Sequence, residues 1–240
     1  MASSYYFGDA LTVLAPAIPR ASEAAFATRA SNAANDLFWG FADWPETITT
    51  LPSFWMQPDE QDHGAPAVIV PTDFRGLRQV YGLEINGDSS RRWPIKVQRD
   101  VELTHATELP KRIQYMPATQ SFRVWPRVPQ SAGSPRYLIT GTYKLRPTRV
   151  TAGTLHSTLL PWEDDDFHVY VACLKWALYF FSGDQRAGQI VKQGSSQQYT
   201  GALAEAIFLL EQLADNEMLE QGEPGLAPEE SLGGFIDRAW

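Results

Sequence analysis

The sequence has a single cysteine among its 240 residues, so it can form no internal disulfide and no metal site built from cysteines. No apolar run approaches the roughly 20 residues that a membrane-spanning helix needs. The first residues carry Asp9 and no basic group ahead of their apolar part, unlike a secretory signal. We therefore expect a protein that is made in the cytoplasm and has no membrane partner.

Signatures of catalysis and cofactor binding are missing as well. The motifs GxSxG, GxxxxGK[ST] and GxGxxG do not occur. The histidines are far apart and show no recurring metal-ligand spacing: His63, His105, His156 and His168. We expect no enzymatic activity, no cofactor and no metal.

Charge is distributed unevenly along the chain. Between residues 75 and 150 there are fourteen Lys or Arg and five Asp or Glu, a net charge of +9. The remaining residues hold six bases and twenty-three acids, a net charge of -17. This asymmetry indicates two modules with different neighbours.

The stretch 158–184 predicts a central helix. Pro161 and the acids at 163–166 suit the positively charged N-terminal end of a helix, and this interpretation is simpler than a cation site. Gly183 is the residue expected to end the helix. Two apolar stripes leave little polar surface, so other helices or another subunit must enclose this helix. We expect subunit packing through one stripe: Phe167, Val171, Leu174, Leu178 and Phe181. Cys173 lies on the other stripe, as a core residue would.

Other segments flank this helix. Residues 1–19 read as extended, Ser22 can cap a helix that ends near Gly40, and the Trp- and Pro-rich residues 42–55 suit an irregular loop. Residues 185–192 read as the start of a helix, and 202–220 form an amphipathic one.

A period of two from residue 67 onward predicts short strands. They cover 67–70, 79–85, 93–97, 112–116, 121–125 and 136–145, with a turn at 86–88 and many prolines between them. The fold class is therefore α+β, a helical bundle with an inserted antiparallel β module and an extended C-terminal tail. The expected domains are 1–64 (N-terminal arm, helix and Trp-rich loop), 65–150 (β module), 151–222 (helical domain) and 223–240 (tail).

Two surfaces are candidates for binding. The β module is basic and could face a partner through Arg91, Arg92, Lys96, Arg99, Arg123 and Arg127. Its Trp93 and Trp125 could stack on sugars or nucleobases, or pack in a core or a subunit interface. The acidic tail ends in apolar groups that fit a docking segment as well as an idle end; its candidate anchors are Phe235, Ile236, Arg238 and Trp240.

The order of segments resembles the head-to-tail adaptor proteins of tailed bacteriophages, especially those of short-tailed phages. AVIVPTDFRGLRQVYGL is similar to the passage that opens the β insertion of that family, and SFRVWPRVPQ followed by RYLITGTYKLRP is similar to its Pro-containing strand and the next strand. LPWEDDDFHVYVACLKWALYFFSGD resembles its helix that ends in Ser-Gly-Asp, with Phe167 where a tyrosine is usual. The likeness covers residues 43–220.

This resemblance implies a structural virion protein of the tail or neck, made in the host cytoplasm. It implies a ring of twelve copies that joins the portal protein to a tail tube or nozzle protein, with genome DNA passing through without sequence-specific binding. It also implies that the C-terminal tail docks on the portal. The alternative from another class is a carbohydrate- or nucleic-acid-binding module that uses the basic, Trp-containing β domain.

Overall fold

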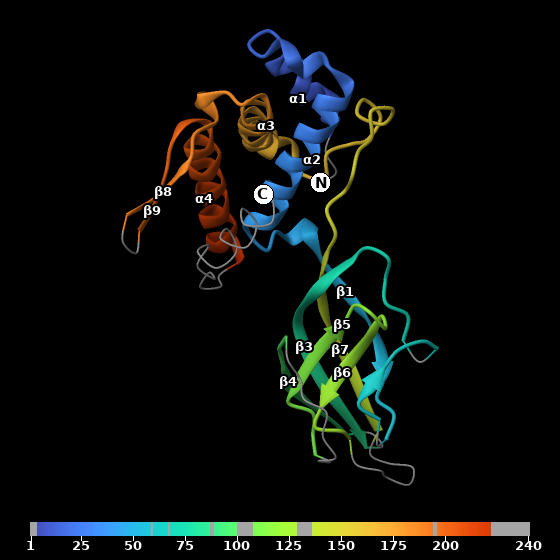
Figure 1. The fold of residues 1–240 in the computed structure, drawn as a ribbon. Helices are drawn as coiled ribbons and strands as arrows, with labels where there is room; N and C mark the ends of the chain where they lie inside the picture. Colours follow the sequence, from blue (N-terminus) through green and yellow to red (C-terminus); the bar gives the residue numbers. More distant parts are fainter. Residues whose placement is uncertain are drawn as a thin grey trace. The chain divides into compact units, whose positions relative to one another are not determined.

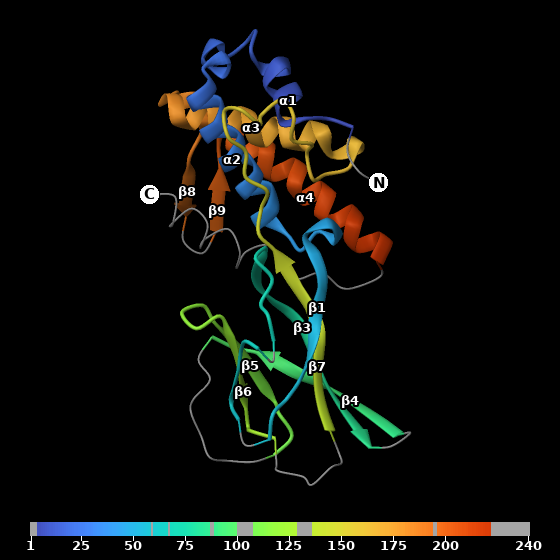
Figure 2. The same ribbon diagram turned by 90° about the vertical axis from the view of Figure 1, so that its right-hand side faces the viewer.

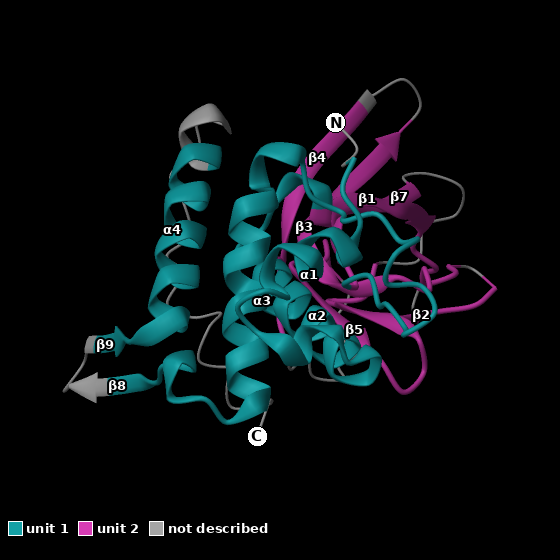
Figure 3. Ribbon diagram, turned by 90° about the horizontal axis from the view of Figure 1, so that it is seen from above, with its two compact units in different colours: residues 1–46, 147–240 teal, residues 47–146 magenta. Residues whose placement is uncertain are grey.

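A computed structural model describes residues 4–221, apart from 59, 67, 87–88, 100–107, 129–135 and 194–195 (Figure 1). The chain divides into two compact units: unit 1 comprises 1–46 and 147–240, and unit 2 is Thr47–Arg146 (Figure 3). The described part of unit 1 holds four α-helices and unit 2 a large curled sheet, so the fold is mixed α+β. The expected helical bundle is not evident, because one helix is short and a β-hairpin separates the last two.

Helix α3 (Phe167–Ser182) lies against the other helices of unit 1, which are α1 (Phe7–Leu14), α2 (Ala24–Phe41) and α4 (Gly201–Gln221). Gly183 adopts the left-handed conformation (φ 69°) that ends α3, as the sequence predicted. The sequence required either other helices or another subunit to cover α3. Helices of the same chain cover Leu174 and Leu178, which are fully buried.

Aromatic side chains fill the centre of unit 1. Phe38 of α2 stacks on Trp162 with ring centroids 3.8 Å apart, and the indole of Trp44 donates to the carbonyl of Phe38 at 2.7 Å. The hydroxyl of Tyr170 donates to the carbonyl of Ser31 at 3.2 Å, and burial raises the pKa of Tyr170. This packing joins α2, α3 and the loop before α3 into one core.

The return from unit 2 to unit 1 is fastened to α2 by side-chain amides. Asn32 donates to the carbonyl of Val150 at 2.9 Å and accepts from its N–H at 3.0 Å, as a neighbouring strand would. Asn35 donates to the carbonyl of Thr148 at 2.8 Å. These bonds satisfy backbone N–H and C=O groups of residues 148–150, which pass along the helix without forming a helix or strand themselves.

Two segments of unit 1 and one helix cap differ from the prediction: the N-cap position of α2 is Glu23 rather than Ser22. Residues 1–19 are not extended throughout, because α1 begins at Phe7 and Asp9 accepts a bond from the N–H of Tyr6 at 2.7 Å. The stretch after α3 forms a 3-10 turn and a hairpin of β8 (Ile190–Gln193) and β9 (Ser196–Tyr199) instead of a helix. The β-branched Ile190 and Val191 favour the strand.

Unit 2 is a seven-stranded sheet with the order β1-β7-β3-β4-β5-β6-β2. Strands β1, β7 and β3 lie side by side along its length (Figure 2). Its pairs are antiparallel except β4 with β5, which is parallel and departs from the expected antiparallel module. The strands are β1 (Ile48–Trp55), β2 (Asp62–His63), β3 (Phe74–Asn86), β4 (Ser89–Val97), β5 (Arg112–Met116), β6 (Ser121–Trp125) and β7 (Arg136–Leu145).

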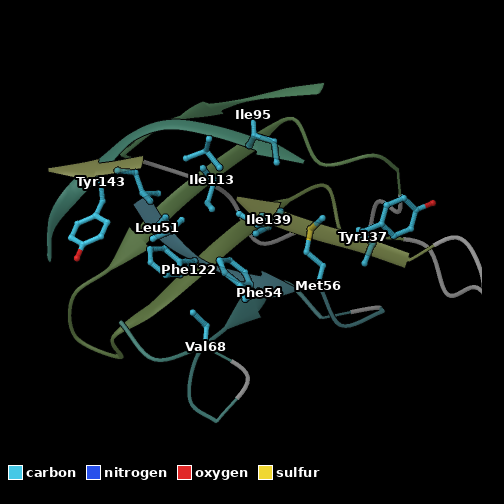
Figure 4. Packing of buried hydrophobic residues seen from close by; sticks show 14 of the residues in the cluster. Leu51, Phe54, Met56, Val68, Ile95, Ile113, Phe122, Tyr137, Ile139 and Tyr143 are labelled. Atoms are coloured by element: carbon cyan, nitrogen blue, oxygen red, sulfur yellow. The ribbon is translucent and has the colours of Figure 1, made fainter. Parts of the chain in front are cut away.

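The sheet curls around one hydrophobic core, and the side chains of its inner face converge there (Figure 4). Alternation correctly predicted β5, β6 and β7, whose Ile113, Phe122 and Ile139 are fully buried. The Trp-rich stretch was misread as a loop: its second half is strand β1. The described residues 68–70 form no strand, contrary to the prediction for 67–70.

Strand β7 approaches β3 closely at Gly141, beside a register shift between Leu77 and Val80. A Cβ atom at Gly141 would lie 2.1 Å from the carbonyl oxygen of Gln79. Backbone cannot yield as a flexible side chain can, so only glycine fits this position.

We therefore predict that Gly141→Ala lowers the free energy of unfolding of unit 2 by about 2–4 kcal/mol through overpacking. Gly76→Ala, in the neighbouring strand, is the matched control, because a Cβ there has no other atom within 4 Å. It should change stability by less than about 1 kcal/mol. Urea unfolding followed by hydrogen exchange in β3 and β7 measures both, and equal effects would contradict the close approach.

His63 is buried at the edge of the same core, beside the ring of Phe54. Burial lowers its pKa from 6.5 to about 4. The neighbouring Asp62 pairs with Arg123 through two hydrogen bonds of 2.7 and 2.8 Å, and this pair lowers the pKa of Asp62.

These shifts predict that acidification weakens unit 2 in two steps. Between pH 6.5 and 4, His63 is protonated in the unfolded chain but remains neutral in the folded chain. The free energy of unfolding therefore falls by up to about 3 kcal/mol from its value at neutral pH. The loss from Asp62 follows at lower pH. His63→Gln should flatten the first step, as measured by urea unfolding at several pH values. An unchanged slope would contradict a buried neutral imidazole.

Candidate interaction surfaces

The six basic residues expected to face a partner lie on strands β4 and β6 and on the residues that follow each strand. Arg91, Arg92 and Lys96 are exposed on β4, and Arg99 lies just after it. Arg123 lies on β6 and is engaged with Asp62, and Arg127 follows β6. The cations available to a partner therefore cluster on β4 and the residues that follow it.

Strand register gathers a second set of residues on the outer face of the sheet, opposite the core. Leu83 of β3 pairs with Arg92 on one side and with Leu138 of β7 on the other, and Leu138 pairs with Trp55 of β1. Their neighbours along the strands, such as Ile139, point into the core, so these side chains point outward. This row crosses four strands and spans roughly 14 Å at about 4.8 Å per strand.

Two guanidinium groups frame this row by stacking on aromatic rings. Arg92 lies 3.6 Å from the ring centre of Tyr81, and Arg136 lies 4.2 Å from that of Trp55. Neither arginine forms an ion pair within the described part of the chain. We call this surface the outer sheet face, and its members are Trp55, Tyr81, Leu83, Ile85, Arg92, Arg136 and Leu138.

The N-terminal segment forms another exposed apolar surface in unit 1. Ser4 donates from its N–H and its hydroxyl to the carboxylate of Asp164, both at 2.7 Å. Tyr5 stacks on Phe167 at 4.1 Å, and Tyr6 forms a β-bridge with Leu159. We call this surface the N-terminal patch, of which Tyr5, Tyr6 and Leu159 remain 38%, 39% and 44% exposed.

Carboxylates border the N-terminal patch. The acids at 164–166 form a 3-10 turn that precedes α3, rather than lying in its first turn. Burial raises the pKa of Asp166 to about 6, and the nearby Glu46, Glu217 and Glu163 raise it further. The turn and the residue before it therefore bring four carboxylates close together, and Glu163 and Asp165 are among the exposed ones.

The remaining predicted residues are placed as follows. Among the strut residues, Phe167, Val171 and Phe181 keep part of their surface exposed, whereas Leu174 and Leu178 do not. The tail anchors Phe235, Ile236, Arg238 and Trp240 lie outside the described residues.

The tryptophans proposed for sugar or base stacking are engaged within unit 2. Trp93 covers Gly82 and its indole donates to the carbonyl of Pro110 at 2.6 Å, while Arg112 lies over Trp125. The described residues contain no group of three or more potential ligands that could hold a metal ion. Cys173 is buried in α3, which raises the pKa of its thiol and disfavours the reactive thiolate.

No helix within the described ranges is long and apolar enough to cross a membrane. The candidate sites of the described chain are therefore surfaces for contact: the outer sheet face, the neighbouring cations of β4 and the N-terminal patch. Of these, sequence reasoning identified only the β4 cations, because the others are assembled from segments far apart in sequence.

No curated protein matches the chain. The family model of the SU10 adaptor protein matches residues 12–223, which covers the described part of both units almost completely. That family comprises phage adaptors, which are structural components of the virion. The chain therefore belongs to the SU10 adaptor protein family.

Proposed function

We propose that this protein is a head-to-tail adaptor of a short-tailed phage, which forms a ring between portal and tail around the DNA channel. The observation that carries the proposal is the family match over residues 12–223. The ring would hold twelve copies, the number implied by the resemblance of the sequence to ring-forming adaptors. The protein would be made in the host cytoplasm and act in the tail or neck of the virion without catalysing a reaction.

The C-terminal tail is the part we assign to the portal. Residues 223–240 carry four acids and one base, and end in the apolar Phe235, Ile236 and Trp240 beside Arg238. Large apolar groups in a polar segment act as anchors when a partner offers pockets. Nineteen residues follow the end of α4 at Gln221, enough to reach roughly 60 Å when extended.

The two units would serve the other contacts. Phe167, Val171 and Phe181 of α3 keep part of their surface exposed, and we assign that remaining surface to a neighbouring copy. The exposed Arg91 and Lys96 of β4 would face an acidic protein surface, either the next copy or a tail tube or nozzle protein. Genome DNA would pass without sequence-specific binding, because a lining of many cations would hold a polyanion back.

The structure gives less support to a carbohydrate- or nucleic-acid-binding module. That function needs an open aromatic face for stacking. Trp93 covers Gly82 and Trp125 lies beneath Arg112, so both rings already have partners within unit 2.

Deletion of residues 233–240 tests the tail assignment. We expect the shortened chain to lose attachment to portal rings of the same phage, because the apolar anchors are gone, and to keep its thermal unfolding midpoint within about 2 °C. Co-sedimentation with the portal measures attachment.

A matched control keeps the length and the apolar groups of the tail. Glu229→Gln with Glu230→Gln removes two charges from the same segment and should retain at least half of the binding. Full binding by the deleted chain, or equal losses in both variants, would refute anchoring by Phe235, Ile236 and Trp240.

A further inference from the structure

The outer sheet face lies on the side of the sheet opposite the core of unit 2. The core lies on the inner side of the curl (Figure 4), and strand register places Leu83, Leu138 and Trp55 on the opposite side, where each keeps part of its surface exposed. Tyrosine, tryptophan and arginine are the residues that protein interfaces favour, and here they surround an apolar centre. Such a surface is typical of a contact with another protein.

The N-terminal patch has the opposite charge and the same general design. Tyr5, Tyr6 and Leu159 form an exposed apolar centre, and the acids at 163–166 lie beside it. Burial raises the pKa of Asp166, and the nearby Glu46, Glu217 and Glu163 raise it further, so negative charge is concentrated beside the patch.

The two surfaces complement each other in charge and in apolar character. Unit 2 holds thirteen Lys or Arg and nine Asp or Glu, a net charge of +4, and the rest of the chain carries -12. Each stacked guanidinium on the outer sheet face presents planar donors to a carboxylate, and the exposed Glu163 and Asp165 supply carboxylates. Apolar centres would meet between these charges.

Nucleic acid fits the outer sheet face less well. Arg92 covers one face of Tyr81 and Arg136 covers one face of Trp55, which removes those faces from base stacking. The central Leu83, Ile85 and Leu138 offer nothing to a phosphate backbone. An apolar row between cations suits an apolar protein surface edged by acids.

We propose that, in the ring inferred above, the outer sheet face of one copy binds the N-terminal patch of the next copy. This contact is heterologous, since it joins two different surfaces, and repeated contacts of that kind close into a ring. It deepens the proposed function and rests on it.

Charge exchange between two chains provides the sharpest test. The first variant, Arg92→Glu with Arg136→Glu, has a negative outer sheet face in addition to its negative N-terminal patch. The second, Glu163→Lys with Asp165→Lys, has a positive N-terminal patch in addition to its positive outer sheet face. Each variant alone should lose copy-to-copy association on portal rings by on the order of 100-fold, because like charges meet at every contact. An equimolar mixture should assemble, since each contact then joins opposite charges. Native mass spectrometry counts copies per portal.

Matched controls carry the same charge changes elsewhere. Lys111→Glu with Arg112→Glu alters exposed cations of unit 2 away from the apolar row, and Glu211→Lys with Asp215→Lys alters exposed acids of α4. Both should assemble as the unaltered chain does. Circular dichroism of every variant confirms folding before assembly is scored.

Cross-linking gives a second measurement that does not need the portal. Chains with Leu83→Cys mixed with chains with Leu159→Cys should give a covalent pair with a short bis-maleimide, and each alone should give little. The native Cys173 adds little background, because it is fully buried.

The outcomes separate the two proposals. Normal assembly by either reversed variant alone, no recovery in the mixture, or no cross-link in concentrated solution and on the portal would overturn this contact. So would loss of DNA retention by the Arg92→Glu, Arg136→Glu variant with unchanged cross-linking, which would assign the surface to nucleic acid. Failure of the proposed function differs: the chains would cross-link but ignore the portal.

Discussion

A sheet that curls around its core buries only one of its faces, and this constraint shapes the protein. The inner face of unit 2 satisfies Phe54, Ile113 and Ile139 within one chain. Its outer face carries an apolar row whose side chains keep part of their surface exposed, while helix α3 of unit 1 is largely enclosed by its own neighbours. The strongest reason for contact with other proteins therefore lies in the β unit, whereas sequence reasoning placed it in the apolar helix.

Local signals predicted much of the fold. Alternation located β5, β6 and β7, and Gly183 marked the end of α3. The same reasoning missed β1, because tryptophans and prolines suit loops, and its pairing with β7 comes from the distant end of unit 2. Helix α1 and the β8–β9 hairpin were missed because short segments depend on tertiary contacts more than on propensity.

The candidate surfaces were harder to predict than the strands. Arg92 was identified from local charge, but Arg136 and Trp55 join it only through strand register, which a single sequence does not specify. The N-terminal patch likewise depends on a bridge between Tyr6 and Leu159. The tail anchors lie outside the described residues, so their role rests on the family and on chemistry.

The central claim is that this chain acts by contact, as one of many copies between portal and tail. Electron cryomicroscopy of the phage neck tests it most directly. The account predicts a closed ring of this chain below the portal, with the β unit of each copy against the N-terminal segment of its neighbour. A neck without this chain, or a ring whose copies leave the outer face of β3 and β7 uncovered, would contradict it.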